Sequence, residues 1–488
     1  MNLSKSKYCN AFQCMKMLWL YQNKPEEAEE LDNEAVFTNG NLVGQKAKGL
    51  FGDYIDIEYN PNLSQMIEDT KKAINENKNA IITEASFLYD HNFCSVDILK
   101  KKDNSYEIYE VKSSTEVKDI YLEDASFQYY VLTKLGYPVK KVSIVHINSD
   151  YVRGKELELD KLFTIVDITD TAKDKLPLVE EMIEEIDDYM KQTEEPNDSI
   201  GIHCVKPYDC PFFAYCTRDL EKPNVFDIRG LNDKIKFDYY QNGIYKYQDL
   251  LKENLKENYK EQIDFELNNR EDKIQKEEIR DFLDTLSYPL YFLDFETFQQ
   301  VIPLYEGIRP YMQIPFQYSL HYIETENGKL LHKEFLAEPG KDPRRSLAEQ
   351  LVKDIPKDVC TLAYNMTFEK TVIKNLAELY PDLSDHLLNI RENMKDLMVP
   401  FQKRQYYTKD MHGSYSIKYV LPALYPDDPS LNYHNLEEVH NGSEAMNAFA
   451  NMESLTEEEQ QKLRHNLLKY CELDTYAMVK IYEKIKKI

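Results

Sequence analysis

The sequence predicts a mixed α/β protein with more than one domain. The chain has 488 residues, of which 42% are hydrophobic and 12% aromatic, enough to form two to four domains with separate cores. Residues 81–147 and 289–369 each contain short apolar strands followed by helical segments, an order typical of α/β layers. Between them, residues 247–284 are highly charged and poor in glycine and proline, which indicates helices. We therefore expect an N-terminal domain over residues 1–220, a helical connector over 221–285 and a C-terminal domain over 286–488.

Composition limits where the protein acts and what it binds. The formal net charge of −26 argues against a general nucleic-acid coat, because phosphate binding depends on positive surface, but it allows an enzyme with a local basic groove. Residues 1–21 lack the long apolar core of a signal peptide, and no stretch reaches the roughly 18 apolar residues of a membrane span. We expect a cytoplasmic protein with no membrane association. Its eight cysteines are then not expected to form disulfides.

The first candidate site lies on a predicted hairpin with strands at 95–99 and 106–114. Because side chains alternate along a strand, Glu110 and Lys112 share a face, and the neighbouring strand can bring Asp97 beside them. Gathered carboxylates repel each other unless a divalent cation such as Mg²⁺ or Mn²⁺ lies between them, and a nearby lysine can polarise an attacking water. This pattern predicts a phosphodiester-cleaving site. A solvated Glu-x-Lys pair is the alternative, but Asp97 lies within an apolar alternation, where an unpaired carboxylate is costly to bury.

Two elements beside the hairpin supply further candidates. A strand predicted at 81–87 places Glu84 just upstream as another possible metal ligand. A helix predicted at 124–135 carries Gln128, and a strand at 141–147 follows it. This order of strand, hairpin, helix and strand fits an α/β layer.

A cysteine-rich loop predicts a metal centre. Cys204, Cys210 and Cys216 lie within thirteen residues that two prolines interrupt. Thiolates at this density are typical metal ligands, and a closed site needs a fourth, for which Cys14 is preferred and Cys9 is the alternative. Spacing alone does not separate an iron–sulfur cluster from zinc, and we expect the cluster. Because it would join residues about 200 positions apart, its role is expected to be structural.

The second candidate site begins with acids on two predicted elements. An apolar strand over 289–297 carries Asp294 and Glu296 on one face at its end. A second strand continues into a helix over 361–369 and places Glu369 in the first turn of that helix.

A helix predicted at 467–476 completes the second site, because Tyr470 and Asp474 stand one turn apart on the same face. Four acids on three elements can hold two metal ions, one activating a water and one stabilising the leaving oxygen. Tyr470 can orient that water. A lone tyrosine is usually a packed aromatic, but the ordered set Asp-x-Glu, Asn-x-x-Phe-Glu and Tyr-x-x-x-Asp is specific.

These residues resemble two nuclease families. Residues 1–220 resemble the RecB-like branch of the PD-(D/E)XK nucleases, which includes CRISPR-adaptation nucleases and AddB-type helicase–nucleases with a four-cysteine iron–sulfur cluster. The resemblance rests on Asp97, Glu110-Val111-Lys112, Gln128, Cys14, Cys204, Cys210 and Cys216. It implies a restriction-endonuclease-like fold, metal-dependent DNA cleavage and a [4Fe–4S] cluster.

Residues 286–488 resemble the DnaQ-like, ribonuclease-H-fold 3′–5′ exonucleases with a DEDDy motif. The resemblance implies that Asp294, Glu296, Glu369 and Asp474 are metal ligands and that Tyr470 positions the nucleophile. Glu369 stands where this family usually has aspartate. The tandem as a whole resembles an uncharacterised bacterial family of two-nuclease proteins.

The sequence therefore predicts a metal-dependent nuclease that acts on DNA in repair, recombination or defence, with a helicase or repair protein as its expected partner. A second hypothesis is an RNA 3′-exonuclease whose N-terminal half only binds nucleic acid and carries the cluster. A third is an acidic scaffold without any cleavage activity.

Overall fold

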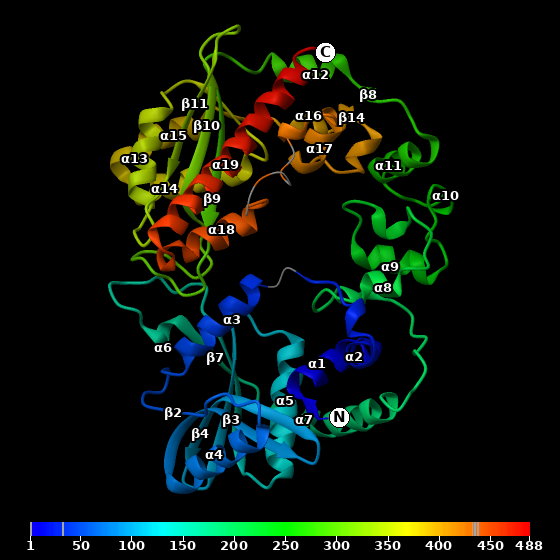
Figure 1. The fold of residues 1–488 in the computed structure, drawn as a ribbon, viewed down its shortest axis with the longest axis vertical. Helices are drawn as coiled ribbons and strands as arrows, with labels where there is room; N and C mark the ends of the chain where they lie inside the picture. The colour runs from blue at the N-terminus through cyan, green and yellow to red at the C-terminus, as the bar shows by residue number, and fades with distance from the viewer. Residues whose placement is uncertain (1, 32–33, 432, 434–435, 437–438) are drawn as a thin grey trace. The chain divides into compact units, whose positions relative to one another are not determined.

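The computed structural model describes residues 2–31, 34–431, 433, 436 and 439–488. It confirms the mixed α/β class, with a seven-stranded sheet, a five-stranded sheet and flanking helices (Figure 1). The chain forms two compact units. The first comprises Met1–Leu220, Asp233–Gln241 and Gln300–Met312, and the second comprises Glu221–Asn232, Asn242–Gln299 and Gln313–Ile488.

This division differs from the expected one at two segments. Residues 221–285 form no separate connector, because residues 233–241 belong to the first unit and the remainder to the second. Residues 300–312, from within the expected C-terminal domain, belong to the first unit. The reason is apolar burial: Val301 and Ile302 lie in one core cluster with Tyr109 and other side chains of the first unit.

The first unit is built on a sheet in which β3, β4 and β5 are antiparallel neighbours and β5 pairs in parallel with β6. Its strands are β1 (Leu3–Ser4), β2 (Ile55–Asp56), β3 (Asn79–Tyr89), β4 (Asn92–Lys102), β5 (Ser105–Lys112), β6 (Val139–Ile147) and β7 (Phe163–Asp167). Its longer helices are α1 (Lys5–Gln13), α2 (Met15–Asn23), α3 (Glu34–Ala47), α4 (Leu63–Glu76), α5 (Asp119–Lys134), α7 (Thr169–Tyr189) and α9 (Asp233–Gln241). The strands and the helix predicted between residues 81 and 147 are confirmed.

Strand alternation divides the core of the first unit between the two faces of its sheet. Leu99 and Ile144 belong to the cluster that contains residues of α5 and α7. Their chain neighbours Ile98 and Val145 belong to the cluster that contains residues of α3. Each strand is thus apolar on both sides, as expected for a sheet that is covered by helices on both faces.

Helix α1 ends before the first cluster cysteine. The side chain of Ser4 caps α1 by accepting a hydrogen bond from the backbone nitrogen of Lys7 at 3.3 Å. The helix stops at Gln13, Cys14 is extended with φ −161° and ψ 116°, and α2 starts at Met15. Cys14 therefore lies at a break between two helices.

The second unit is built on a mixed sheet in the order β11-β10-β9-β12-β13. β9 is antiparallel to β10 and parallel to β12. The strands of this sheet are β9 (Leu290–Phe298), β10 (Ile314–Ile323), β11 (Leu330–Leu336), β12 (Cys360–Ala363) and β13 (Met394–Asp396). The longer helices are α11 (Glu257–Asn268), α12 (Lys276–Leu283), α13 (Arg344–Asp354), α14 (Thr367–Leu379), α15 (Pro381–Glu392), α17 (Ile417–Leu424), α18 (Gly442–Asn451) and α19 (Glu457–Ile485).

The two faces of β9 have different partners. Tyr291, Leu293 and Phe295 lie in a core cluster with residues of α13 and α14. On the other face, the ring of Phe292 lies 5.7 Å from that of Tyr482 on α19, and Figure 1 shows α19 crossing this sheet. Asp294 and Glu296 share this second face because side chains alternate. Within the described part of the chain, no helix has both the length and the apolar character needed to cross a membrane.

Candidate functional site

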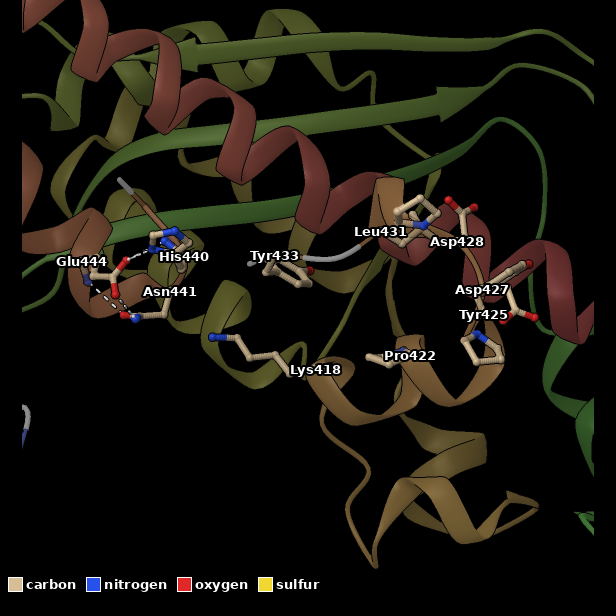
Figure 2. A pocket seen from close by; sticks show the side chains of 12 residues that line it. Lys418, Pro422, Tyr425, Asp427, Asp428, Leu431, Tyr433, His440, Asn441 and Glu444 are labelled. Carbon is tan, nitrogen blue, oxygen red and sulfur yellow. Dashed lines mark hydrogen bonds and ion pairs between the residues drawn. The ribbon is translucent and has the colours of Figure 1, made fainter. Parts of the chain in front are cut away.

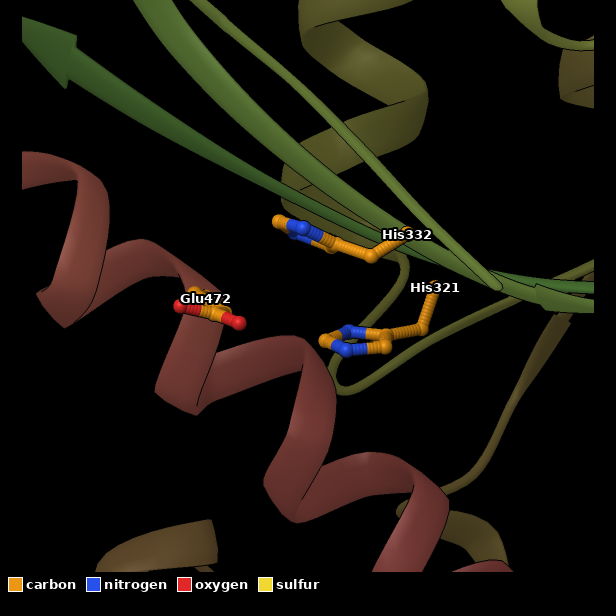
Figure 3. A group of neighbouring side chains, drawn as sticks. All are labelled: His321, His332 and Glu472. Atoms are coloured by element: carbon orange, nitrogen blue, oxygen red, sulfur yellow. The ribbon is translucent and has the colours of Figure 1, made fainter. Parts of the chain in front are cut away.

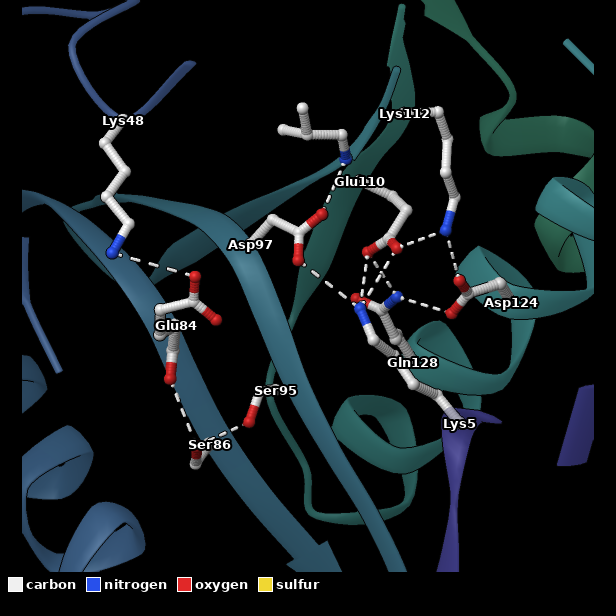
Figure 4. A network of polar contacts seen from close by, with 11 residues as sticks. Lys5, Lys48, Glu84, Ser86, Ser95, Asp97, Glu110, Lys112, Asp124 and Gln128 are labelled. Carbon is white, nitrogen blue, oxygen red and sulfur yellow. Dashed lines mark hydrogen bonds and ion pairs between the residues drawn. The ribbon is translucent and has the colours of Figure 1, made fainter. Parts of the chain in front are cut away.

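The acids predicted on β4 and β5 meet a glutamine on α5 in a network of polar contacts (Figure 4). Glu110 is only 1% exposed. The Nε2 of Gln128 donates to Oε2 of Glu110 at 2.6 Å and to Oδ1 of Asp124 at 3.0 Å. Asp97 is held from the other side, since its Oδ2 accepts a hydrogen bond from the backbone nitrogen of Val111 at 2.7 Å. The structure thus brings Asp97, Glu110 and Gln128 together.

Two lysines balance the charge of these acids. The Nζ of Lys112 lies 2.7 Å from Oε1 of Glu110 and 2.6 Å from Oδ2 of Asp124. The Nζ of Lys5 lies 3.0 Å from Glu110 Oε1 and 3.4 Å from Asp97 Oδ1. The ammonium of Lys5 therefore lies between the two carboxylates that a shared metal ion would contact.

Asp124 and Lys5 are not among the residues that the sequence predicts for this site. Asp124 stands one helical turn before Gln128 on α5, so their i, i+4 spacing was a signal that could have identified it. Lys5 gave no such signal, because it lies 92 residues from Asp97 in the sequence.

The network shifts the protonation of its members in opposite directions. Burial and the carboxylates of Asp124 and Asp97 raise the pKa of Glu110 to about 8. Burial would raise the pKa of Asp124, but Lys112 and Lys5 outweigh it, so this pKa is lowered. The pKa of Lys112 is raised, because Asp124 and Glu110 outweigh the lowering effect of burial.

Glu84 lies at the margin of this network. Thr83 pairs with Ile98 and Ala85 with Val96, so Glu84 on β3 stands opposite Asp97 at an irregular point of the ladder. Its φ of +57° marks that irregularity. Burial and Asp97 raise its pKa, and its Oε1 lies 3.7 Å from the Nζ of Lys48.

The four predicted cluster cysteines line one small cavity in the first unit. Its lining consists of Cys14, Lys16, Met17, Leu20, Asp198, Ser199, Ile200, His203, Cys204, Cys210, Phe212, Phe213 and Cys216. The side chain of Gln13 fastens the end of α1 to the cysteine loop by donating to the carbonyl oxygens of His203 at 2.8 Å and Tyr208 at 2.7 Å. Burial and the neighbouring thiols Cys14 and Cys216 raise the pKa of Cys204 to about 11.

Cys9 does not share this cavity. Its pKa is raised by burial and by Asp124, and the charges of Lys112 and Glu110 also act on it. Cys9 therefore lies beside the acidic network, which leaves Cys14 as the fourth thiol next to the loop.

The predicted residues of the second unit converge on the face of β9 that α19 covers. Ligand atoms of Asp294, Glu296 and Cys471 all lie within 4.8 Å of one another. Asp474 on α19 accepts a hydrogen bond from the hydroxyl of Tyr433 at 2.7 Å. Tyr470 stands one helical turn before Asp474 on the same helix, and burial and the charge of Asp474 raise the pKa of Tyr470.

Glu369 comes to this site from the first turn of α14. It is 3% exposed, and its Oε2 has no hydrogen-bond partner among the described residues. The charge of Glu369 also helps to raise the pKa of Asp294. A buried carboxylate oxygen without a donor is costly, and a cation would satisfy it.

Mutual repulsion and burial dominate the electrostatics of these four acids. The pKa of Asp294 is raised well above its usual value by burial and by the charges of Asp474, Glu296 and Glu369. Burial raises the pKa of Glu369 to about 8. Burial also raises that of Asp474 to about 6, although the Tyr433 hydrogen bond opposes the shift.

A cavity of about 970 Å³ in the second unit is lined by two side chains, Lys418 and Tyr433, that interact with the acids (Figure 2). Its lining includes Lys418, Tyr425, Tyr433, His440, Asn441 and Glu444. Tyr433 binds Asp474, and the positive charge of Lys418 lowers the pKa of Glu296 and Asp474 against the effect of burial. Lys418 and Tyr433 are not among the residues that the sequence predicts, because neither belongs to a motif with fixed spacing to the acids.

Comparison with known proteins identifies similar sequences, but their descriptions name no activity. Residues 291–416 match a family model described as "Domain of unknown function (DUF2779)", a range that includes Asp294, Glu296 and Glu369 but ends before α19. The chain is 29% identical over 265 residues to "Uncharacterized protein UU173" of Ureaplasma parvum serovar 3 (strain ATCC 700970). This match covers 49% of the chain and 37% of that relative's length.

The position of Lys5 predicts competition between its ammonium and a divalent cation. In a Lys5→Met protein, a metal ion no longer has to displace a charge that already lies between Asp97 and Glu110. We expect Mn²⁺ affinity at this site to rise by about tenfold, or ~1.4 kcal/mol. The measurement is an EPR titration of free Mn²⁺, with Asp294→Asn present to weaken binding in the second unit. Lys7→Met, on the same helix, is the control, and unchanged or weaker binding in Lys5→Met would contradict the prediction.

The raised pKa values in the second unit predict how stability depends on pH. Between the ordinary pKa near 4 and the folded values of about 6 to 8, the folded protein binds more protons than the unfolded one, so stability falls as pH rises through this window. Without divalent metal we expect Tm to decrease from pH 5 to pH 8, by roughly 2–4 °C per kcal/mol. Mn²⁺ should reverse the decrease at pH 8. Asp294→Asn should flatten it and the exposed-carboxylate control Glu392→Gln should not, whereas Tm rising from pH 5 to pH 8 would show that the sign is wrong.

Proposed function

We propose that this protein is a metal-dependent nuclease that hydrolyses phosphodiester bonds of DNA. It would have a PD-(D/E)XK-type site at Asp97, Glu110 and Lys112 and a DEDDy-type 3′–5′ exonuclease site in the second unit. The observation that carries the proposal is the convergence of Asp294, Glu296, Glu369 and Asp474 from β9, α14 and α19 at one buried place, with Tyr470 one helical turn before the last of them.

The donor set of the second unit fits hard divalent cations. Carboxylate oxygens are the ligands that Mg²⁺ and Mn²⁺ prefer, and the partnerless Oε2 of Glu369 leaves a ligand position to fill. When bound, such cations would supply an activated water and charge stabilisation for the leaving oxygen. Asp294, Glu296, Glu369 and Asp474 would hold them.

The surrounding side chains can orient the reactants. Tyr470 stands one turn before Asp474 on α19, so its hydroxyl can position the attacking water. Lys418 supplies a positive charge that both reaches the acids and lines the cavity. A cavity of about 970 Å³ is at the upper end of the usual size for ligand sites and can admit a terminal nucleotide. A local cation of this kind would offset the repulsion between DNA and a chain of net charge −26.

In the first unit, Lys112 would polarise the attacking water, and Gln128 would keep Glu110 and Asp124 in place through its two donated hydrogen bonds. Asp97 and Glu110 would hold the cation, with Glu84 beside Asp97 as an additional acid. Lys5 would have to move away from the carboxylates before a cation could bind between them.

For the cysteine cavity we propose a structural [4Fe–4S] cluster, with zinc as the alternative. Four thiols that line one cavity suit either group. The resemblance of the first unit to nucleases with a four-cysteine cluster is what favours the cluster.

A cytoplasmic role in repair, recombination or defence, with a helicase or repair protein as partner, belongs to the same proposal. The mixed five-stranded sheet of the second unit is compatible with a ribonuclease-H-like fold, and the hairpin, helix and parallel strand of the first unit with a PD-(D/E)XK fold.

One observation favours a second candidate function, an RNA 3′-exonuclease whose first unit binds nucleic acid without cleaving it. The ammonium of Lys5 already neutralises the carboxylates of Asp97 and Glu110. A site that is satisfied by its own lysine needs no metal ion.

The nuclease proposal predicts Mg²⁺- or Mn²⁺-dependent digestion of end-labelled DNA. Asp294→Asn should lower 3′-end degradation by at least about 100-fold, as when other charge-stabilising groups are removed, and Lys112→Ala should lower the remaining cleavage. A gel assay over linear and circular DNA and RNA measures both activities, because circles report only endonuclease action.

Glu458→Gln, at an exposed carboxylate of α19, is the matched control and should retain full activity. A double variant Lys112→Ala/Asp294→Asn that still digests DNA at the wild-type rate would refute the proposal. RNA degradation that Asp294→Asn abolishes, with intact DNA in every reaction, would support the second candidate instead.

The cluster proposal predicts a brown protein that absorbs near 400 nm after purification without oxygen. Cys210→Ser should remove this absorbance and the bound iron. Cys360→Ser, at a buried cysteine of the second unit, should leave both unchanged. A colourless wild-type protein that contains zinc would contradict the cluster and show that zinc is the bound metal.

A further inference from the structure

A group of two histidines and a glutamate lies on the sheet of the second unit, outside the proposed acid site (Figure 3). His321 on β10 and His332 on β11 stand directly opposite each other in the antiparallel ladder. Their rings lie 4.4 Å apart with an interplanar angle of 33°. Glu472 faces them from α19, and ligand atoms of all three residues lie within 4.8 Å of one another.

A hydroxyl group holds one nitrogen of each ring. The Nδ1 of His321 lies 2.7 Å from Oγ1 of Thr475, and the Nε2 of His332 lies 2.9 Å from Oγ of Ser319. These two hydroxyls are themselves 2.6 Å apart. Histidines that ligate metals usually have the second ring nitrogen fixed in this way, since the hydrogen bond sets the tautomer and the ring orientation. The other nitrogen of each ring is then available as a ligand.

The protonation of the group also suits a metal ion. His321 is 4% exposed, and burial together with the neighbouring His332 lowers its pKa to about 4. A neutral imidazole is the form that binds metals. The Nζ of Lys469 lies 2.7 Å from Oε2 of Glu472.

We propose that His321, His332 and Glu472 bind one Zn²⁺ ion, with a water molecule as the fourth ligand. Two imidazoles and one carboxylate form a set that zinc accepts in proteins, whereas magnesium prefers oxygen ligands alone. The three residues come from β10, β11 and α19, so the ion would fasten α19 to the sheet.

This zinc ion would help to position the neighbouring acids, because the residues that hold its histidine ligands lie next to those acids. Ser319, which holds His332, is paired with Asp294 across β9 and β10. Thr475, which holds His321, directly follows Asp474 on α19. The inference does not depend on nuclease activity, because its ligands are separate from the proposed catalytic acids.

The test is zinc binding by the full-length protein. Wild-type protein and His332→Ala are each dialysed against Zn²⁺ and analysed for bound metal, and His386→Ala, at a half-buried histidine of α15, serves as the matched control. We expect His332→Ala to lose one equivalent of zinc relative to the wild type and to the control. Equal zinc content in all three proteins would overturn the proposal. If His332→Ala does not fold, Glu472→Gln replaces it, because that side chain is only half-buried.

Cobalt separates this site from the thiols and the other acids. Co²⁺ bound by imidazole and carboxylate should give weak visible bands that persist in Cys210→Ser and disappear in His332→Ala. Visible bands that survive in the double variant Cys210→Ser/His332→Ala would overturn the proposal. Thr475→Val removes only the hydroxyl that holds His321, so zinc affinity should fall by about 10–100-fold. Unchanged affinity in Thr475→Val would show that the two hydroxyls do not orient a ligand.

Discussion

Both acidic sites are governed by the cost of gathering carboxylates where water is scarce. An ionised carboxylate in a low-dielectric environment is tolerated only beside a compensating charge or hydrogen-bond donors. The first unit provides two ammonium groups of its own, from Lys5 and Lys112, within 3.4 Å of its acids. Even so, burial and the neighbouring carboxylates raise the pKa of Glu110 to about 8. In the second unit the compensating groups are the hydroxyl of Tyr433 and the more remote charge of Lys418, and the pKa values of Asp294 and Asp474 are raised. Protons in the metal-free protein, or cations in the proposed working form, must supply the remainder.

Helix α19 links the chemistry of the second unit to its packing. The helix crosses β9 and β10, and its consecutive turns present residues to both strands. Tyr470 and Asp474 reach the acid site, whereas Glu472 and Thr475 reach the histidines. Any shift of this helix would move both sets together. Metal ligands must keep fixed separations, so a second link between α19 and the sheet would stabilise the acid site. This is the role proposed for zinc.

The sequence predicts those parts of the sites that depend on short-range periodicity. Alternation along β9 places Asp294 and Glu296 on one face, and the four-residue spacing on α19 places Tyr470 one turn before Asp474. Contacts between distant segments could not be derived in this way. The position of Lys5 depends on how α1 packs against the sheet, and residues 300–312 join the first unit through burial of their own apolar side chains. Periodicity identifies the face on which a side chain lies, but not the distant residue that it meets.

The proposed metal centres differ in the softness of their ligands, and this difference could let one chain sort its metals. Carboxylates favour Mg²⁺ or Mn²⁺, four thiolates accept an iron–sulfur cluster or zinc, and two imidazoles with one carboxylate favour Zn²⁺. Cys471 complicates this division, because its Sγ lies 3.8 Å from Oδ2 of Asp294 within the acid site. A thiol there offers zinc a ligand that magnesium would not use. Burial and Asp294 raise the pKa of Cys471 well above its usual value, which keeps the sulfur protonated and less available to zinc. The neighbouring negative charges that favour Mg²⁺ or Mn²⁺ at this site therefore also make the thiol of Cys471 a weaker ligand for zinc.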